Sequence, residues 1–100
     1  MASIKIVSIP PGQAPESVRK EWIGVVIPLL PEQEDDVIGC GVLDGVPSNE
    51  NRGGYQVSAR VAVDEVKKKA PEAGQWWEEN LDGLDDMNFV FAKSVCELVV

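Results

Sequence analysis

The chain has 100 residues, of which 44% are hydrophobic, and it carries nine basic and seventeen acidic side chains but no histidine. This length and apolar content predict one globular domain, residues 1–100, with a single core, and they argue against intrinsic disorder. The net charge of −8 repels phosphate backbones and anionic lipid surfaces, so we expect neither nucleic acid nor a membrane as a partner. Without histidine, a Ser-His-Asp or Cys-His mechanism is excluded.

The first part of the chain predicts three strands and one short helix. Residues 3–9 are rich in Ile and Val and predict a buried strand with apolar side chains on both faces. Residues 15–21 predict a helix of one or two turns, because they begin with a proline, which suits the first helical position. Residues 22–30 predict a second strand, in which Pro28 requires a sheet edge or a bulge. Residues 37–43 follow an acidic turn and predict a third strand.

The second part of the chain changes from the period of a strand to that of a helix. Turn-forming residues at 44–54 predict a loop, across which the third strand should pair antiparallel with a fourth. Residues 55–63 predict this fourth strand, because apolar side chains alternate with mostly polar ones. The apolar spacing that follows is helical, and Pro71 favours two short helices, near 64–69 and 71–80, over one kinked helix.

The predicted fold class is mainly β to α+β, with a small antiparallel sheet of five strands. Residues 89–99 supply the fifth strand, which brings phenylalanines and valines to the core. The order of elements is similar to that of a partly open SH3-like barrel with a helical segment, about 64–81, before the last strand. The similarity is one of pattern alone, since no family motif is matched. The alternative is an open α+β sheet with the helices on one face.

The cysteines and the apolar runs bear on location. Cys40 and Cys96 each lie among apolar residues, which predicts two reduced thiols in or near the core, with a disulfide between neighbouring strands as the alternative. Lys5 interrupts the first apolar run, so we expect no signal peptide and a cytoplasmic location. The longest apolar run, at 22–30, is broken by Pro28 and is too short to span a bilayer.

Three tryptophans in a chain of this size suggest an interaction surface. On a helical wheel Trp77 falls within the apolar stripe, and Trp76 lies about 100° to one side, at its margin. One interpretation is that these rings pack on the sheet. The other is an exposed aromatic patch for a protein partner, near the tip of the 44–54 loop, because aromatic residues are enriched at binding hot spots. The predicted patch comprises Trp22, Tyr55, Trp76, Asn49, Asn51 and Arg52.

The remaining polar features carry no specific chemistry. Two acidic clusters could supply oxygen ligands for a divalent cation, but neither has the spacing of an EF-hand loop; they comprise Glu32, Glu34, Asp35 and Asp36, and Asp82, Asp85 and Asp86. No phosphate-binding glycine motif is present. We therefore expect no catalytic residue, no metal site and no cofactor. The first hypothesis is a non-catalytic protein-interaction or ligand-binding module, monomeric or weakly oligomeric.

Two alternatives come from other functional classes. The first is a small enzyme or divalent-metal-dependent domain that uses the acidic loops. The second is an acidic mimic of nucleic acid that binds a basic partner, since the net charge has the required sign.

Overall fold

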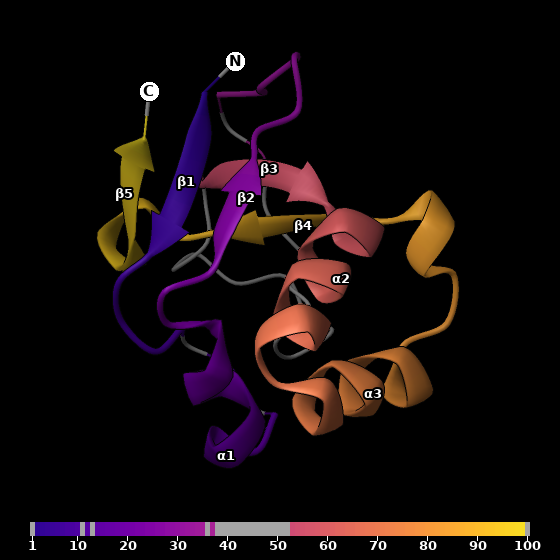
Figure 1. Ribbon diagram of the computed structural model, residues 1–100. Helices are drawn as coiled ribbons and strands as arrows, with labels where there is room; N and C mark the ends of the chain where they lie inside the picture. Colours follow the sequence, from indigo (N-terminus) through magenta and orange to yellow (C-terminus); the bar gives the residue numbers. More distant parts are fainter. Residues whose placement is uncertain (1, 11, 13, 36, 38–52, 100) are drawn as a thin grey trace.

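The computed structural model describes residues 2–10, 12, 14–35, 37 and 53–99, and these residues form a small α+β fold (Figure 1). Its strands belong to two antiparallel sheets, one with the order β2-β1-β5 and one that pairs β3 with β4. The strands are β1 (Ser3–Ile6), β2 (Val26–Pro28), β3 (Tyr55–Ser58), β4 (Asn88–Phe91) and β5 (Cys96–Val99). The helices are α1 (Glu16–Arg19), α2 (Ala59–Lys69) and α3 (Pro71–Asn80), with 3-10 turns η1 (Lys20–Trp22), η3 (Leu84–Asp86) and η4 (Lys93–Val95).

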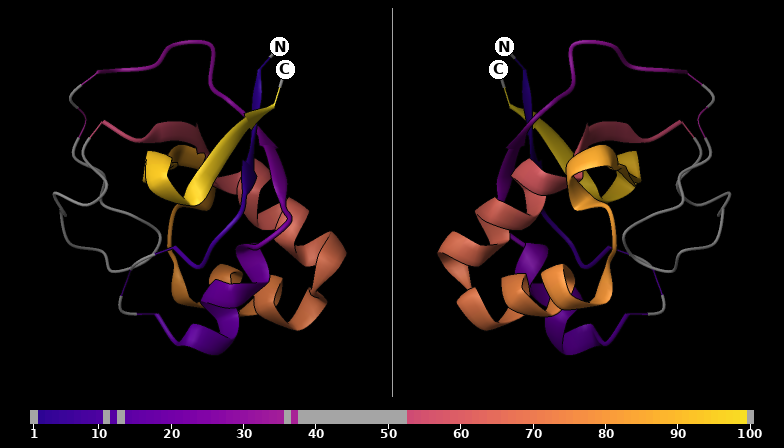
Figure 2. Two further views of the ribbon diagram at one scale, coloured as in Figure 1. Left: turned by 90° about the vertical axis from the view of Figure 1, so that its left-hand side faces the viewer. Right: turned by 90° about the vertical axis from the view of Figure 1, so that its right-hand side faces the viewer.

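The central strand of the larger sheet is β1. Ile4 lies opposite Ile27 of β2 and Leu98 of β5, and Ile4 and Ile27 are fully buried on the inner face. Pro28 ends the outer strand β2, where its missing N–H group costs no ladder hydrogen bond, as the sequence predicted. The two chain ends lie side by side at the end of the molecule that is distant from α1 and α3 (Figure 2).

The core is centred on an aromatic cluster. The Trp22 ring lies 5.6 Å from that of Trp77, 5.2 Å from Phe91 and 6.2 Å from Phe89, centroid to centroid. All four side chains are fully buried. The indole N–H groups of Trp22 and Trp77 find no hydrogen-bond acceptor within the described part of the chain. Each unpaired donor costs about 1–3 kcal/mol, which burial of the large rings offsets because each covers about 150–250 Å² of apolar surface.

The predicted strand at 55–63 is wrong beyond Ser58, where α2 begins. The hydroxyl oxygen of Ser58 accepts a hydrogen bond from the backbone N–H of Val61, and this caps the helix. Burial then follows a helical period: the buried positions of α2 are Ala59, Ala62, Val63 and Val66. The prediction of two short helices around Pro71 is confirmed, because the backbone at Ala70 leaves helical geometry between α2 and α3.

The other predicted strands are shorter than expected or divided. The 89–99 strand is wrong as a single element, because β4 pairs with β3 while β5 pairs with β1, and the turn η4 separates them. The strands predicted at 3–9 and 22–30 shrink to β1 and β2, and Trp22 lies in η1. The third strand, at 37–43, lies outside the described residues except for Val37.

These differences bear on the predicted architecture. The α+β class is confirmed, but the described strands do not form one five-stranded sheet, and the SH3-like barrel is not confirmed. Of the helices that the structure describes, none has the length and apolar character needed to cross a membrane.

Candidate interaction site

Trp76 occupies the outer margin of the aromatic cluster. Its side chain is half-buried, whereas that of its neighbour Trp77 is fully buried. The two rings meet edge to face, with centroids 4.7 Å apart and planes at 87°. The helical wheel predicted this division, with Trp77 in the core and Trp76 at its edge. Trp76 therefore joins the protein surface to the core through Trp77 and Trp22.

A surface groove lies between α1, η1 and the first turns of α3. Its volume is about 590 Å³, which falls within the usual range for ligand sites of about 300–1,000 Å³. Its lining residues come from two segments far apart in the sequence: Ser17, Val18 and Glu21, and Ala70, Pro71, Glu72, Ala73 and Trp76. Most of this lining is apolar. We call it the Trp76 groove.

The path of the chain between α2 and α3 fixes the position of Trp76. Pro71 takes the first position of α3, where the missing N–H group costs no helical hydrogen bond. Gly74 is buried and lies against the backbone of α2, since a Cβ atom added there would come within 2.6 Å of the Lys67 Cα atom. Only glycine allows this close approach. The sequence thus turns α3 back tightly along α2 and directs Trp76 to the edge of the groove.

Lys69 ties the opposite wall of the groove to α2. Its ammonium group donates hydrogen bonds to the backbone oxygens of Glu21, at 3.1 Å, and of Ile23. It also lies 3.9 Å from the Glu21 carboxylate. A cation at the carboxyl end of a helix is favoured by the helix dipole. Lys69 therefore stabilises the end of α2 and holds η1 in place at the same time.

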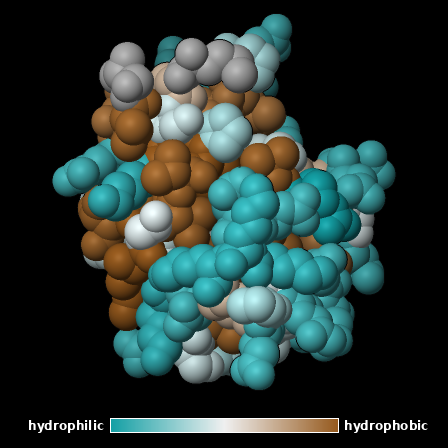
Figure 3. Space-filling view, in the orientation of Figure 1, coloured by the Kyte–Doolittle hydropathy of each residue, from teal (hydrophilic) through white to brown (hydrophobic). Residues whose placement is uncertain are grey.

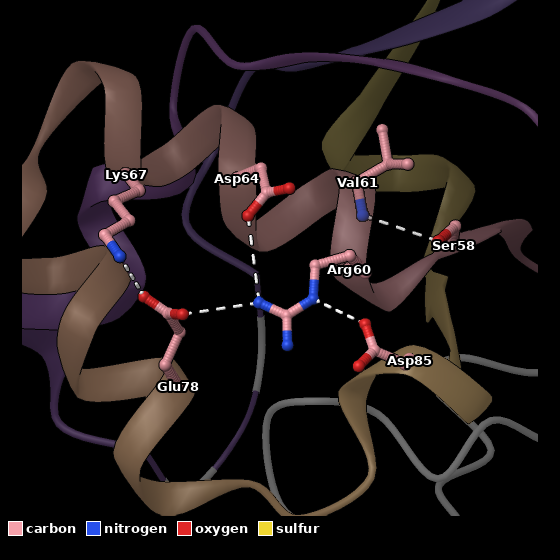
Figure 4. A network of polar contacts seen from close by, with 7 residues as sticks. All are labelled: Ser58, Arg60, Val61, Asp64, Lys67, Glu78 and Asp85. Atoms are coloured by element: carbon pink, nitrogen blue, oxygen red, sulfur yellow. Dashed lines mark hydrogen bonds and ion pairs between the residues drawn. The ribbon is translucent and has the colours of Figure 1, made fainter.

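An ion-pair network fixes the other half of α3 (Figure 4). Arg60 of α2 donates to Asp85 of η3 at 2.8 Å and to Glu78 of α3 at 3.3 Å, and it lies 3.8 Å from Asp64. Lys67 donates to the second oxygen of Glu78. Hydrogen bonds and charge from Lys67 and then Arg60 lower the pKa of Glu78, and the hydrogen bond to Asp85 is the main reason that the pKa of Arg60 is raised. The network joins α2, α3 and η3.

The three described residues of the predicted patch, Trp22, Tyr55 and Trp76, lie in different surroundings. Trp22 is fully buried in the core, so it offers no surface to a partner. Asn49, Asn51 and Arg52 lie outside the described residues. Tyr55 is half-buried at a different hollow, of about 270 Å³, where the Lys93 ammonium lies 5.4 Å from its ring centroid. Of the three aromatic residues proposed, only Trp76 lines the groove.

The smaller hollow beside Tyr55 is organised by the buried Gln56 side chain. Its amide donates to the backbone oxygens of Gly54 and Glu34, at 2.9 and 3.0 Å, and its oxygen accepts from the Glu34 N–H at 2.7 Å. The Gln33 side chain in turn bonds both backbone groups of Gln56. The polar groups of Gln56 are thus used to hold the segment at 33–34 against β3, which is a structural task.

The acidic clusters form no metal site in the part of the chain that the structure describes. There, no three side chains of Cys, Asp or Glu gather closely enough to hold a cation. Asp85 is instead committed to Arg60. Asp36 lies outside the described residues.

A second exposed surface is apolar and lies on the three-stranded sheet. Over the region where Figure 1 places β1, β2 and β5, Figure 3 shows hydrophobic atoms, whereas hydrophilic atoms cover α2 and α3. On the outer face of this sheet Val26 and Val99 are exposed beside Lys5 and Glu97. Nothing in the described structure indicates what would cover this face.

Sequence reasoning missed the α1 side of the groove and Glu72. The wall formed by Ser17, Val18 and Glu21 depends on a long-range contact with α3, which no local pattern reports. Glu72 had a usable signal, because it precedes Trp76 by four residues and so lies on the same face of the helix.

Comparisons with protein-family models, curated proteins and solved structures found no match to this chain. The site is therefore assigned from its geometry.

Proposed function

We propose that the protein is a non-catalytic protein-interaction module and that the Trp76 groove is its binding site. The observation that carries the proposal is a half-buried tryptophan at the edge of a largely apolar groove of about 590 Å³. Tryptophan is among the residues most enriched at binding hot spots. The groove offers such an anchor on a helix whose position is fixed at both ends.

The rigidity of the groove supports this proposal further. Gly74 packs against α2 near one end of α3, and Glu78 is held by Arg60 and Lys67 near the other. The facing wall is held by Lys69. A site built on fixed elements loses less conformational entropy when a partner binds. The entropic cost of ordering the groove therefore subtracts less from the free energy of binding.

The first experiment is acrylamide quenching of tryptophan emission in the wild type and in Trp76→Ala. We expect two protected indoles, Trp22 and Trp77, and one quenchable indole that Trp76→Ala removes. The variant should stay folded, because Trp76 lies at the margin of the core and the fully buried aromatic cluster of Trp22, Trp77, Phe89 and Phe91 is left intact. Gln75→Ala, at an exposed position of the same helix, is the matched control. Three protected indoles in the wild type would remove the basis of the proposal.

The binding function itself is tested by selection from a random peptide display library. Wild-type protein serves as bait, and Trp76→Ala serves in a counter-selection that removes peptides bound elsewhere. Recovery of peptides whose affinity falls with Trp76→Ala, but not with Gln75→Ala or with Val26→Ser on the apolar sheet face, supports the proposal. If every recovered peptide binds Trp76→Ala as well as it binds the wild type, the groove is not the binding site.

A further inference from the structure

We infer that the Trp76 groove recognises an arginine-bearing amphipathic segment of a partner protein, an inference that rests on the proposed function. Among the described residues, the ionisable groups that line the groove are two carboxylates, Glu21 from η1 and Glu72 from α3. The remaining lining is apolar apart from Ser17. A ligand that complements this surface carries positive charge beside an apolar side chain.

The spacing of Glu72 and Trp76 selects arginine over lysine. Residues four apart on a helix lie on the same face, with Cβ atoms about 5–6 Å from each other. A planar guanidinium can contact the part of the Trp76 indole that lines the groove and direct its N–H groups to the Glu72 carboxylate at the same time. A lysine ammonium is a point charge without a planar surface, so its contact with the indole would be weaker. In this arrangement the neighbouring apolar side chain of the ligand fills the groove beside Val18 and Ala73.

Two cations that lie close to the groove in sequence, Arg19 and Lys69, are committed to contacts within the protein. Arg19 donates to the backbone oxygens of Ala14 and Pro10, at 2.7 and 2.9 Å. Lys69 donates to the backbone of η1 and partly neutralises Glu21 across 3.9 Å. No such contact is made by Glu72 among the described residues, which leaves it as the principal anchor for a ligand cation. The net charge of −8 adds a long-range attraction for a basic segment.

The test uses the peptides recovered by the library selection described above. We expect their sequences to share an arginine next to a large apolar residue. Each arginine is then replaced by citrulline, which keeps the shape and removes the charge, and affinities are measured by fluorescence anisotropy. Glu72→Gln and citrulline should each weaken binding by about three- to tenfold. Applied together they should cost little more than either alone, because both remove the same contact.

Glu79→Gln is the matched control, since it removes the same charge from an exposed position of α3 that does not line the groove. It should change the affinity by less than about twofold. Trp76-dependent peptides that are neutral or acidic, or that bind Glu72→Gln as tightly as the wild type, would overturn the inference while the proposed function stands. A selection without any Trp76-dependent peptide would overturn both.

Discussion

Replacing Gly74 by alanine tests the packing of α3 against α2, on which the groove depends. In an exposed helix this change stabilises by about 1 kcal/mol, because alanine is the better helix former. Here the added Cβ atom would lie 2.6 Å from both the Cα and the Cβ atoms of Lys67 and 2.9 Å from its backbone nitrogen. Ordinary carbon contacts are about 3.5–4.0 Å, so one helix must move. Forcing an extra methyl group into a packed contact costs about 1–3 kcal/mol.

The upper part of that range applies, because two of the three contacted atoms are backbone and cannot rotate away. We therefore expect Gly74→Ala to lower the free energy of unfolding by about 1–2 kcal/mol, after the propensity gain is subtracted. In a domain of this size each kcal/mol lowers the melting temperature by about 4–8 °C.

Urea denaturation followed by circular dichroism measures the effect, with Gln75→Ala as the control at the adjacent exposed position. The control should change stability by no more than about 0.5 kcal/mol. Trp76 quenching should also change in Gly74→Ala, because α3 carries the indole. A Gly74→Ala protein as stable as the wild type, or more stable, would refute the close approach of the two helices.

Three other predictions concern other parts of the fold. Ser58→Ala should lower the free energy of unfolding by about 0.5–1 kcal/mol through loss of the α2 cap, and an unchanged urea midpoint would contradict the cap. Because the pKa of Glu78 is lowered in the folded state, its stabilisation is complete above the ordinary value of 4.5 and is lost as the pH falls through the lowered pKa. Glu78→Gln should therefore lose less stability than the wild type on acidification, and parallel pH profiles would count against the network. Burial raises the pKa of the Cys96 thiol to about 12. In a Cys40→Ser background, iodoacetamide at a pH near 8 should modify Cys96 more than about tenfold more slowly in the native protein than in urea, and equal rates would show an exposed thiol.

The boundary between β3 and α2 shows where local patterns stop being informative. The segment Ala59-Arg60-Val61-Ala62-Val63 carries apolar residues at a spacing that fits both a strand and a helix. β-branched valines favour a strand, yet the cap at Ser58 and burial on one helical face favour the helix. The helical alternative wins because α2 can then cover the core beside β2, β3 and β4. By contrast, Pro71 fixed the start of α3 from the sequence alone, because proline acts through its own backbone.

Sheet topology was less predictable than helix position. Residues 89–99 have the composition of one continuous strand, but the chain turns at η4 and gives its halves to different sheets. The first half, β4, pairs with β3, whereas the second half, β5, pairs with β1 near the other end of the chain. Such pairing is decided by contacts far apart in sequence, on which local propensity has no bearing.

The candidate site was predictable only in part, for the same reason. A helical wheel placed Trp76 at the margin of the core. This was possible because the position of a side chain around a single helix follows from the helical period alone. Trp22 was included in the alternative of an exposed aromatic patch, and its complete burial contradicts that part of the alternative. The α1 wall of the groove could not be predicted, since nothing near Val18 or Glu21 in the sequence indicates a contact with α3.

Four cations both stabilise this fold and reduce the negative charge of its surface. Arg60 and Lys67 bridge α2 to α3, Lys69 bridges α2 to η1, and Arg19 holds the segment that precedes α1. These side chains donate their hydrogen bonds to carboxylate or backbone oxygens of the protein itself. Among the described residues, ion pairs involve the carboxylates of Glu21, Asp64, Glu65, Glu78 and Asp85. The other carboxylates of the described residues are exposed, and Glu72 is the one among them that lines the Trp76 groove. Removing one of the bridging cations would make the surface more acidic and would also loosen the groove, so the proposed attraction for a basic partner cannot be strengthened in that way without weakening the proposed binding site.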